Sequence, residues 1–285
     1  MKIHTPASIH ARLLALAQSR REDFNLTLNR YALERFLYRL SLSPAREYYW
    51  LKGALLFDVW FDVPHRPTRD ADFLGFGPQD HDAVRTLLTE VCGIEVADAM
   101  TFNAGSIAIE QIREDARYGG LRVRITGLLG RARCSVQLDI GYGDAVTPAP
   151  EEIDCPTMLS DLPVARLRAY PRATVVSEKL EAIVNLGIAN SRMKDYFDLR
   201  ALAREGAIDR IELTAAVAAT FERRGTPIPD VLPIGLSEEF ARDARKIAQW
   251  RAFLDKNRLS APSLEEVVAE VRVFLLPALK AASLE

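Results

Sequence analysis

The sequence contains few cysteines and few histidines, and neither residue type has the spacing of a metal site. The three cysteines, Cys92, Cys134 and Cys155, lie far apart and form no C-x-x-C pair. This pattern predicts reduced thiols rather than disulfides or a redox motif. The four histidines form no pair at helical spacing, so a zinc site is not expected.

Long hydrophobic runs and an excess of one charge are also absent. The longest stretch without a charged side chain is about eleven residues, 99–109, whereas a membrane-spanning helix needs ~20 apolar residues. The beginning of the chain has no apolar core of a signal peptide, so we expect a cytoplasmic protein. Lys and Arg number 37 and Asp and Glu 39, a net charge of −2. This balance excludes coating of nucleic acid by bulk charge but not a local basic patch.

The chain changes character near its middle. Its 285 residues suggest about two domains. Strands and helices alternate in the first half, a linker-like stretch rich in proline follows, and the remainder has helical apolar spacing. We therefore expect an α+β protein of mixed α/β character, with a first domain at 1–160 and a mainly helical C-terminal lobe at 161–285. The prolines of the linker-like stretch are Pro148, Pro150, Pro156 and Pro163.

Apolar periodicity gives the expected elements. Helices are predicted over 6–42 (two of them), 54–61, 79–92, 174–187, 194–205, 209–224, 237–256 and 263–282. Strands are predicted over 48–51, 70–76, 104–113, 121–129 and 134–142. Thr174 and Ser263 are the expected N-caps of their helices.

The segment Thr68-Arg69-Asp70-Ala71-Asp72-Phe73 carries two carboxylates at alternate positions. In a strand, residues i and i+2 face the same way, so Asp70 and Asp72 share one side and Ala71 takes the other. Two carboxylates that close repel each other unless a cation neutralises them, and a hard divalent cation such as Mg²⁺ is the natural partner. The alternative, from this motif alone, is a solvated strand end.

A third carboxylate, Asp139, lies within the otherwise apolar strand Val136-Gln137-Leu138-Asp139-Ile140-Gly141. A buried carboxylate without a partner is unfavourable. On a strand that neighbours residues 70–76, Asp139 would complete a three-carboxylate cluster with Asp70 and Asp72. Such a cluster can hold two metal ions for phosphoryl or nucleotidyl transfer. Lys52-Gly53-Ala54 places a glycine turn before a predicted helix, which fits either a phosphate cradle or a simple tight turn.

The helical half has its own group of charged residues. Lys179 lies on a predicted helix, and Arg192 and Lys194 stand at the start of the next, where the helix dipole does not favour a cation. Asp195 and Asp198 are one turn apart and share a side of that helix. The group fits contacts with a nucleoside triphosphate, and it also fits an ion-paired contact between the two lobes.

Together these segments resemble the AbiEii-type nucleotidyltransferases, the toxin halves of AbiEi/AbiEii-like toxin–antitoxin systems, in the polymerase-β-like nucleotidyltransferase superfamily. The matching segments follow the family order over about residues 50–200. They are Leu51-Lys52-Gly53-Ala54-Leu55-Leu56, Arg66-Pro67-Thr68-Arg69-Asp70-Ala71-Asp72, Gln137-Leu138-Asp139-Ile140-Gly141-Tyr142-Gly143-Asp144, Glu178-Lys179-Leu180-Glu181-Ala182 and Ser191-Arg192-Met193-Lys194-Asp195-Tyr196-Phe197-Asp198-Leu199.

The resemblance implies a polymerase-β-like fold, with a mixed sheet flanked by helices and a helical C-terminal lobe, and an NTP substrate with Mg²⁺. It implies that Asp70, Asp72 and Asp139 bind the metal, and that Asp139 is also the base that activates an acceptor hydroxyl. The resemblance also implies that Lys179 and Asp195 are catalytic residues. The nucleotide-binding residues that it implies are Lys52, Gly53, Ala54, Arg69, Lys179, Arg192, Lys194 and Asp198.

The acceptor implied by the resemblance is an RNA 3′ end, expected to be that of tRNA, and the implied partner is an AbiEi-like antitoxin. Two other functions stay open: NMP transfer to a protein or a small molecule, and a non-catalytic protein that binds nucleotide or antitoxin. No membrane contact is expected. Basic residues for RNA contact recur at Arg66, Arg69, Arg113, Arg117, Arg122, Arg124, Arg131 and Arg133.

Overall fold

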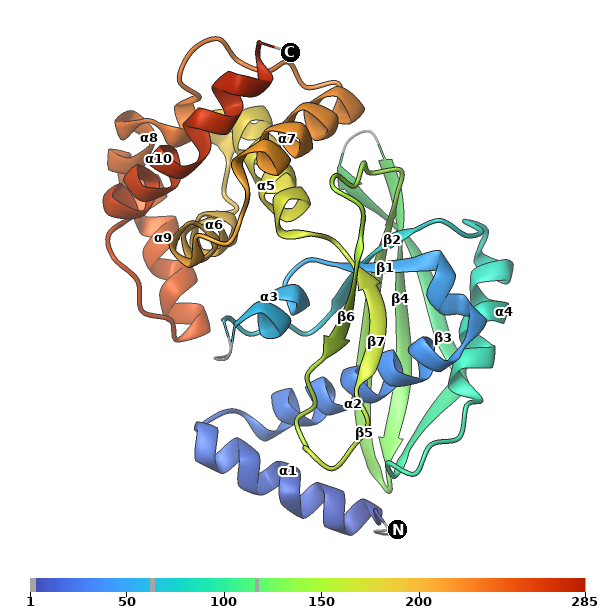
Figure 1. Ribbon diagram of the computed structural model, residues 1–285. Coiled ribbons are helices and arrows are strands. Elements are labelled where there is room, and N and C mark those ends of the chain that lie inside the picture. Colours follow the sequence, from blue (N-terminus) through green and yellow to red (C-terminus); the bar gives the residue numbers. More distant parts are fainter. Residues whose placement is uncertain (1–3, 62–64, 116–117, 285) are drawn as a thin grey trace. The chain divides into compact units, whose positions relative to one another are not determined.

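The computed structural model describes residues 4–61, 65–115 and 118–284 (Figure 1). The chain divides into two compact units. The first comprises residues 1–143 and 151–169 and contains the sheet, and the second comprises 144–150 and 170–285 and is built from helices. The mixed sheet and the helical C-terminal part confirm the expected fold class.

The first unit is organised around one seven-stranded sheet in the order β3-β4-β5-β2-β1-β7-β6. The pairs β2–β5 and β1–β7 are parallel, and the four other neighbouring pairs are antiparallel, so the sheet is mixed. The strands are β1 (Tyr49–Lys52), β2 (Ala71–Gly75), β3 (Met100–Asp115), β4 (Tyr118–Leu129), β5 (Ala132–Tyr142), β6 (Glu151–Cys155) and β7 (Ala165–Ala169).

Helices cover one face of this sheet, and α2 runs along it in contact with β5 and β7 (Figure 1). The alternation of β5 explains the packing: Val136, Leu138 and Ile140 are buried apolar residues of one face, so Asp139 stands on the other. Side-chain caps fix the starts of three helices, as expected for Thr and Asp at this position. The helices of this unit are α1 (Pro6–Arg20), α2 (Phe24–Leu42), α3 (Leu55–Trp60) and α4 (His81–Cys92), with the 3₁₀ turn η1 (Pro44–Tyr48).

A buried ion pair ties α2 to the segment that leads into β3. The Arg39 guanidinium donates from Nη1 to Asp98 Oδ2 at 2.7 Å and from Nη2 to Asp98 Oδ1 at 3.0 Å. Arg39 also donates to the carbonyl of Met100, and both charged side chains are almost fully buried. Because the two charges are paired in this fork geometry, their attraction offsets the cost of removing them from water. The pair fixes the position of α2 along the segment that leads into β3.

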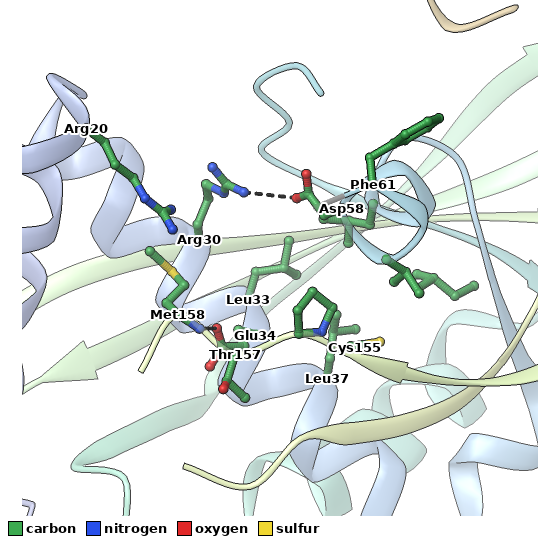
Figure 2. A pocket seen from close by; sticks show the side chains of 14 residues that line it. Arg20, Arg30, Leu33, Glu34, Leu37, Asp58, Phe61, Cys155, Thr157 and Met158 are labelled. Atoms are coloured by element: carbon green, nitrogen blue, oxygen red, sulfur yellow. Dashed lines mark hydrogen bonds and ion pairs between the residues drawn. The ribbon is translucent and has the colours of Figure 1, made fainter. Parts of the chain in front are cut away.

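A cavity of about 180 Å³ lies in this unit beside α2, α3 and residues 155–158 (Figure 2). Its walls are largely apolar, but Arg30 forms an ion pair with Asp58 at 2.9 Å and the Met158 N–H donates to Glu34 Oε2 at 2.6 Å. Burial raises the pKa of Glu34 to about 7, although the neighbouring Arg35 and the Met158 N–H favour its ionised form. The cavity therefore contains a carboxyl group that titrates near neutrality.

The second unit is all helical where it is described. Ser263 caps α10, as the sequence predicts, and the structure adds that it forms a reciprocal capping box with Glu266. The prediction for Thr174 is wrong: α5 starts earlier, and the Thr174 hydroxyl, inside the helix, donates to the Thr147 carbonyl. The helices are α5 (Arg172–Leu186), α6 (Met193–Glu205), α7 (Arg210–Arg224), α8 (Glu238–Arg242), α9 (Ala244–Asn257) and α10 (Leu264–Ala282), with the 3₁₀ turns η2 (Gly187–Ala189) and η3 (Ile234–Leu236).

Two further sequence expectations need correction. The single helix predicted over 237–256 is two helices, because Asp243 is extended and caps α9 through a bond from the Lys246 N–H. The linker-like stretch contains strands β6 and β7, and its prolines lie outside both strands.

Across the described residues, no helix combines the length and the apolar character that a membrane span requires.

Candidate active site

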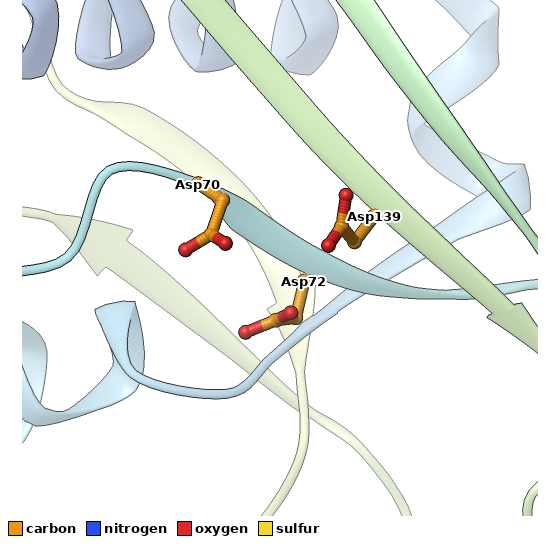
Figure 3. Close-up of side chains that lie close together, drawn as sticks. All are labelled: Asp70, Asp72 and Asp139. Carbon is orange, nitrogen blue, oxygen red and sulfur yellow. The ribbon is translucent and has the colours of Figure 1, made fainter. Parts of the chain in front are cut away.

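The structure brings Asp70, Asp72 and Asp139 together as a carboxylate cluster (Figure 3). Asp72 on β2 stands directly opposite Asp139 on β5 in the parallel pairing of the two strands. Asp70 immediately precedes β2, and one oxygen from each of the three carboxylates lies within 4.8 Å of the others. Ala71, between the two aspartates, is fully buried on the opposite side, as the alternation predicts.

The cluster is part of a charged row that crosses the sheet. Lys52 of β1 stands opposite Asp72, Asp139 stands opposite Arg122 of β4, and Arg122 stands opposite Glu110 of β3. Directly opposed residues of neighbouring strands share a face. The row therefore sets cations on both sides of the central pair of carboxylates.

Arg122 holds Asp139 through a fork of two hydrogen bonds. Its Nε donates to Asp139 Oδ1 at 2.9 Å and its Nη2 donates to Oδ2 at 2.6 Å. Gln137 Nε2 also donates to Oδ1, at 3.2 Å. The hydrogen bond to Asp139, and then the charges of Asp139 and Asp70, raise the pKa of the Arg122 guanidinium above its usual value. Asp139 is thus buried with its partner supplied by the next strand, a role for Arg122 that the sequence did not reveal.

The turn at Gly53 brings the backbone against the cluster. Gly53 has a φ of +76°, which favours glycine, and a Cβ built there would lie 1.9 Å from Asp72 Oδ2. Only glycine satisfies both conditions, so this turn and the carboxylate fix each other's position. Lys52 before it and Ala54 after it are both buried.

Asp70 is oriented by its own loop. The Thr68 hydroxyl donates to Asp70 Oδ1 at 2.9 Å, and Thr68 itself is buried. Arg69, between them, is exposed. Asp70 and Asp72 are half-buried, so their oxygens are accessible from solvent while Asp139 supplies the buried corner of the cluster.

The donor set fits a hard divalent cation. Three carboxylates within 4.8 Å offer the oxygen ligands that Mg²⁺ prefers. Such a concentration of negative charge is unfavourable unless cations balance it. Lys52 of β1 and Arg122 of β4 stand on the two sides of the Asp72–Asp139 pair, and Asp70 and Asp72 are half-buried.

In the second unit, Lys179, Arg192, Asp195 and Asp198 form a helical ion cluster. Lys179 Nζ donates to Asp195 Oδ1 and to Asp198 Oδ2, each at 2.8 Å, and both aspartates are fully buried. Arg192 Nε donates to Asp195 Oδ2 at 2.6 Å. Burial opposes ionisation of Asp195, but the charges of Lys179 and Arg192 outweigh it and lower the pKa of that carboxyl. The cluster is therefore paired within its own unit, whereas Lys194 is exposed.

The basic residues expected to contact RNA fall into different environments. Arg122 and Arg124 of β4 are ion-paired with Asp139 and Glu110, whereas Arg131 and Arg133 are exposed. Arg66 is half-buried in the loop before β2 and takes part in an interaction there. Arg117 and the side chain of Arg113 lie outside the described part of the chain.

A family model described as the nucleotidyl transferase AbiEii toxin of a type IV toxin–antitoxin system matches residues 35–271. The chain belongs to this family. It is therefore a nucleotidyltransferase of the AbiEii toxin type, and the family implies an NTP substrate and a possible antitoxin. The match covers the whole sheet, Gly53, the carboxylate cluster and the helical ion cluster.

Solved structures show the same fold. MenT4, a nucleotidyltransferase toxin from Mycobacterium tuberculosis H37Rv, is 17% identical with a TM-score of 0.59, over 97% of this AbiEii chain and 94% of that one. JHP933 from Helicobacter pylori is also 17% identical, with a TM-score of 0.52 over 90% and 93% of the two chains. At this identity the likeness concerns the fold alone. No curated protein sequence matches the chain.

Proposed function

We propose that this AbiEii protein transfers NMP from an NTP to the 3′-hydroxyl of an RNA, with tRNA as the expected acceptor and Mg²⁺ as the metal. The observation that supports this best is the carboxylate cluster, in which Asp72 and Asp139 face each other and Asp70 lies within 4.8 Å of both. A cytoplasmic protein meets both substrates, and an AbiEi-like antitoxin would restrain its toxicity.

In this proposal Asp70, Asp72 and Asp139 hold Mg²⁺, which when bound supplies neutralising charge for the triphosphate. Asp139 accepts the proton of the acceptor hydroxyl. The acceptor oxygen forms a bond to the α-phosphorus, the bond from that phosphorus to the β-phosphate oxygen breaks, and pyrophosphate leaves. The carboxylate is suited to this role because Arg122 fixes its orientation.

The turn at Lys52, Gly53 and Ala54 is the proposed triphosphate contact, together with Arg69. Gly53 brings backbone within reach of the cluster, as its approach to Asp72 requires. Backbone N–H groups bind phosphate without a side-chain hydroxyl, so Ala54 suffices where the superfamily has Gly or Ser. The nucleotide roles implied for Lys179, Arg192, Lys194, Asp195 and Asp198 stay predictions.

For the acceptor, the supporting feature is the exposed Arg133 on β5. Residues at even spacing along a strand share a side, so Arg133 shares with Asp139 the side of β5 that α2 does not cover. A guanidinium there suits a phosphate backbone. Because acceptor choice depends on surface shape, a protein or small-molecule acceptor is an outcome that the experiment must distinguish.

The test incubates the purified protein with each labelled NTP, Mg²⁺ and total tRNA, beside Asp70→Ala. The matched control is Asp230→Ala, which removes an exposed carboxylate of the second unit. We expect label in RNA with wild type and with the control, and none with Asp70→Ala. If the label enters protein or a small molecule instead, that molecule and not RNA is the acceptor. If the protein binds nucleotide but transfers NMP to no acceptor, its function is non-catalytic. Sequencing of RNA 3′ ends after expression identifies the acceptor in cells.

A further inference from the structure

The hydrogen-bond capacity of Asp139 is mostly used by the protein itself. An ionised carboxylate has about four lone-pair sites, two on each oxygen. Oδ1 accepts from Arg122 Nε at 2.9 Å and from Gln137 Nε2 at 3.2 Å, and Oδ2 accepts from Arg122 Nη2 at 2.6 Å. One site on Oδ2 is left by these bonds. A metal ion bound to Asp139 would therefore share this carboxylate with Arg122.

The surroundings of Arg122 set it apart from a purely structural cation. Its side chain is 32% exposed, whereas Arg39, in the structural pair with Asp98, is 2% exposed. Arg122 lies beside the cluster on the exposed side of β4, and the charge of Asp70 also acts on it. Removal of the Arg122 side chain therefore opens no buried core.

We infer that Arg122 is a positioning residue that keeps the metal affinity of the nucleotide-free protein low, so that metal loads efficiently only with the negatively charged triphosphate. The inference rests on the proposed metal-dependent function. The reason is electrostatic: a guanidinium beside the cluster repels an arriving divalent cation, and a triphosphate supplies charge that offsets it. The fork from Arg122 also holds the plane of the Asp139 carboxylate for the reaction.

The neighbouring Arg124 provides a matched control. It lies two residues along β4 on the same side, and it donates to Glu110 Oε1 at 2.7 Å rather than to a residue of the cluster. Its side chain is 44% exposed. Arg124→Gln thus removes the same charge from the same strand without touching Asp139.

The experiment measures Mn²⁺ binding by calorimetry, with and without a non-hydrolysable NTP analogue, for wild type, Arg122→Gln, Arg122→Lys and Arg124→Gln. We expect Arg122→Gln to bind Mn²⁺ about tenfold more tightly without nucleotide, and to gain less from the analogue than wild type. Arg122→Lys keeps the charge but not the fork, so its Mn²⁺ affinity stays near wild type while its kcat falls. Arg124→Gln keeps the wild-type Mn²⁺ affinity.

The outcomes separate this inference from the proposed function. If wild type binds Mn²⁺ and Arg122→Gln binds it no more tightly than Arg124→Gln does, the positioning role is overturned and the proposed function stands. If wild type binds no Mn²⁺ with or without the analogue, both fail. Thermal melting of each variant accompanies the titrations and shows whether it is folded. If Arg122→Gln does not fold, Arg122→Lys decides the question. An Mn²⁺ affinity of Arg122→Lys well above that of wild type contradicts the role of charge.

Discussion

A Cβ at Gly53 would lie 1.9 Å from Oδ2 of Asp72, so the backbone of the turn after β1 lies directly against the Asp72 side chain of β2. We predict that Gly53→Ala lowers nucleotidyl transfer by more than about 100-fold, because a displacement of about 1 Å at a reacting centre has an effect of this order. Measurement of kcat/KM on the identified acceptor checks this.

The control for that variant is Gly206→Ala. Gly206 has a φ of +67°, close to the +76° of Gly53, but no atom lies within 4 Å of the position of its Cβ. Both substitutions carry the backbone strain of a left-handed conformation, about 1 kcal/mol. Equal losses of activity in the two variants would mean that strain, and not the displacement of Asp72, is responsible.

Asp70→Asn and Asp72→Asn are expected to abolish transfer while the melting temperature stays the same or rises. Each substitution removes one of three clustered negative charges and so relieves repulsion in the metal-free protein. Asp98→Asn provides the contrast, because it leaves the buried Arg39 without its counter-ion and lowers stability by about 3–5 kcal/mol. A large drop in melting temperature for Asp70→Asn or Asp72→Asn would identify these residues as structural. If the protein is toxic, cells that express Asp70→Asn also grow better than cells with wild type.

Lys179→Met is expected to destabilise the second unit by about 3–5 kcal/mol, because it leaves Asp195 and Asp198 buried beside each other with Arg192 as the remaining cation of the cluster. Loss of activity in this variant alone therefore assigns no role. The double variant Lys179→Met/Asp198→Asn restores the charge balance and most of the stability. If the double variant also recovers transfer, the predicted catalytic role of Lys179 is wrong.

The ionisation of Glu34 makes the free energy of unfolding depend on pH. Burial raises its pKa from the usual 4.5 to about 7. Between these values the folded protein keeps a proton that the unfolded chain has lost, so this group's contribution to stability falls as pH rises, by about 3 kcal/mol at most. We expect Glu34→Gln to lose less stability than wild type between pH 4.5 and pH 7 in urea titrations. Glu90→Gln, at an exposed glutamate, is the control and follows the wild-type slope.

The sequence predicts most elements of this fold because their periodicity is strong. Helices α1, α2 and α4 and strands β2 and β5 lie where apolar spacing places them, within a few residues. β7 was missed although Leu167 is buried between half-buried or exposed arginines, because five residues between prolines also read as linker. The sequence does not reveal the break between α8 and α9 at Asp243, because a capping aspartate at a polar position leaves the apolar periodicity of a helix unchanged.

The sequence predicts the local part of the candidate site, but not the contacts that depend on strand pairing. Asp70 and Asp72 share a side by strand alternation, which is a local property. The position of Asp139 opposite Asp72 depends on which strands pair and in which register, and the resemblance to a family supplied that knowledge. Nothing local ties Arg122 to Asp139, because their contact follows from the register of β4 against β5.

The parallel pairing of β2 with β5 has a consequence for synthesis of the protein. Asp72 and Asp139 are 67 residues apart in the chain (139 − 72), and β3 and β4 lie between them. A chain emerging from the ribosome therefore carries only part of its carboxylate cluster until β5 has left the exit tunnel and paired with β2. A nascent chain that ends before β5 therefore lacks one of the three carboxylates.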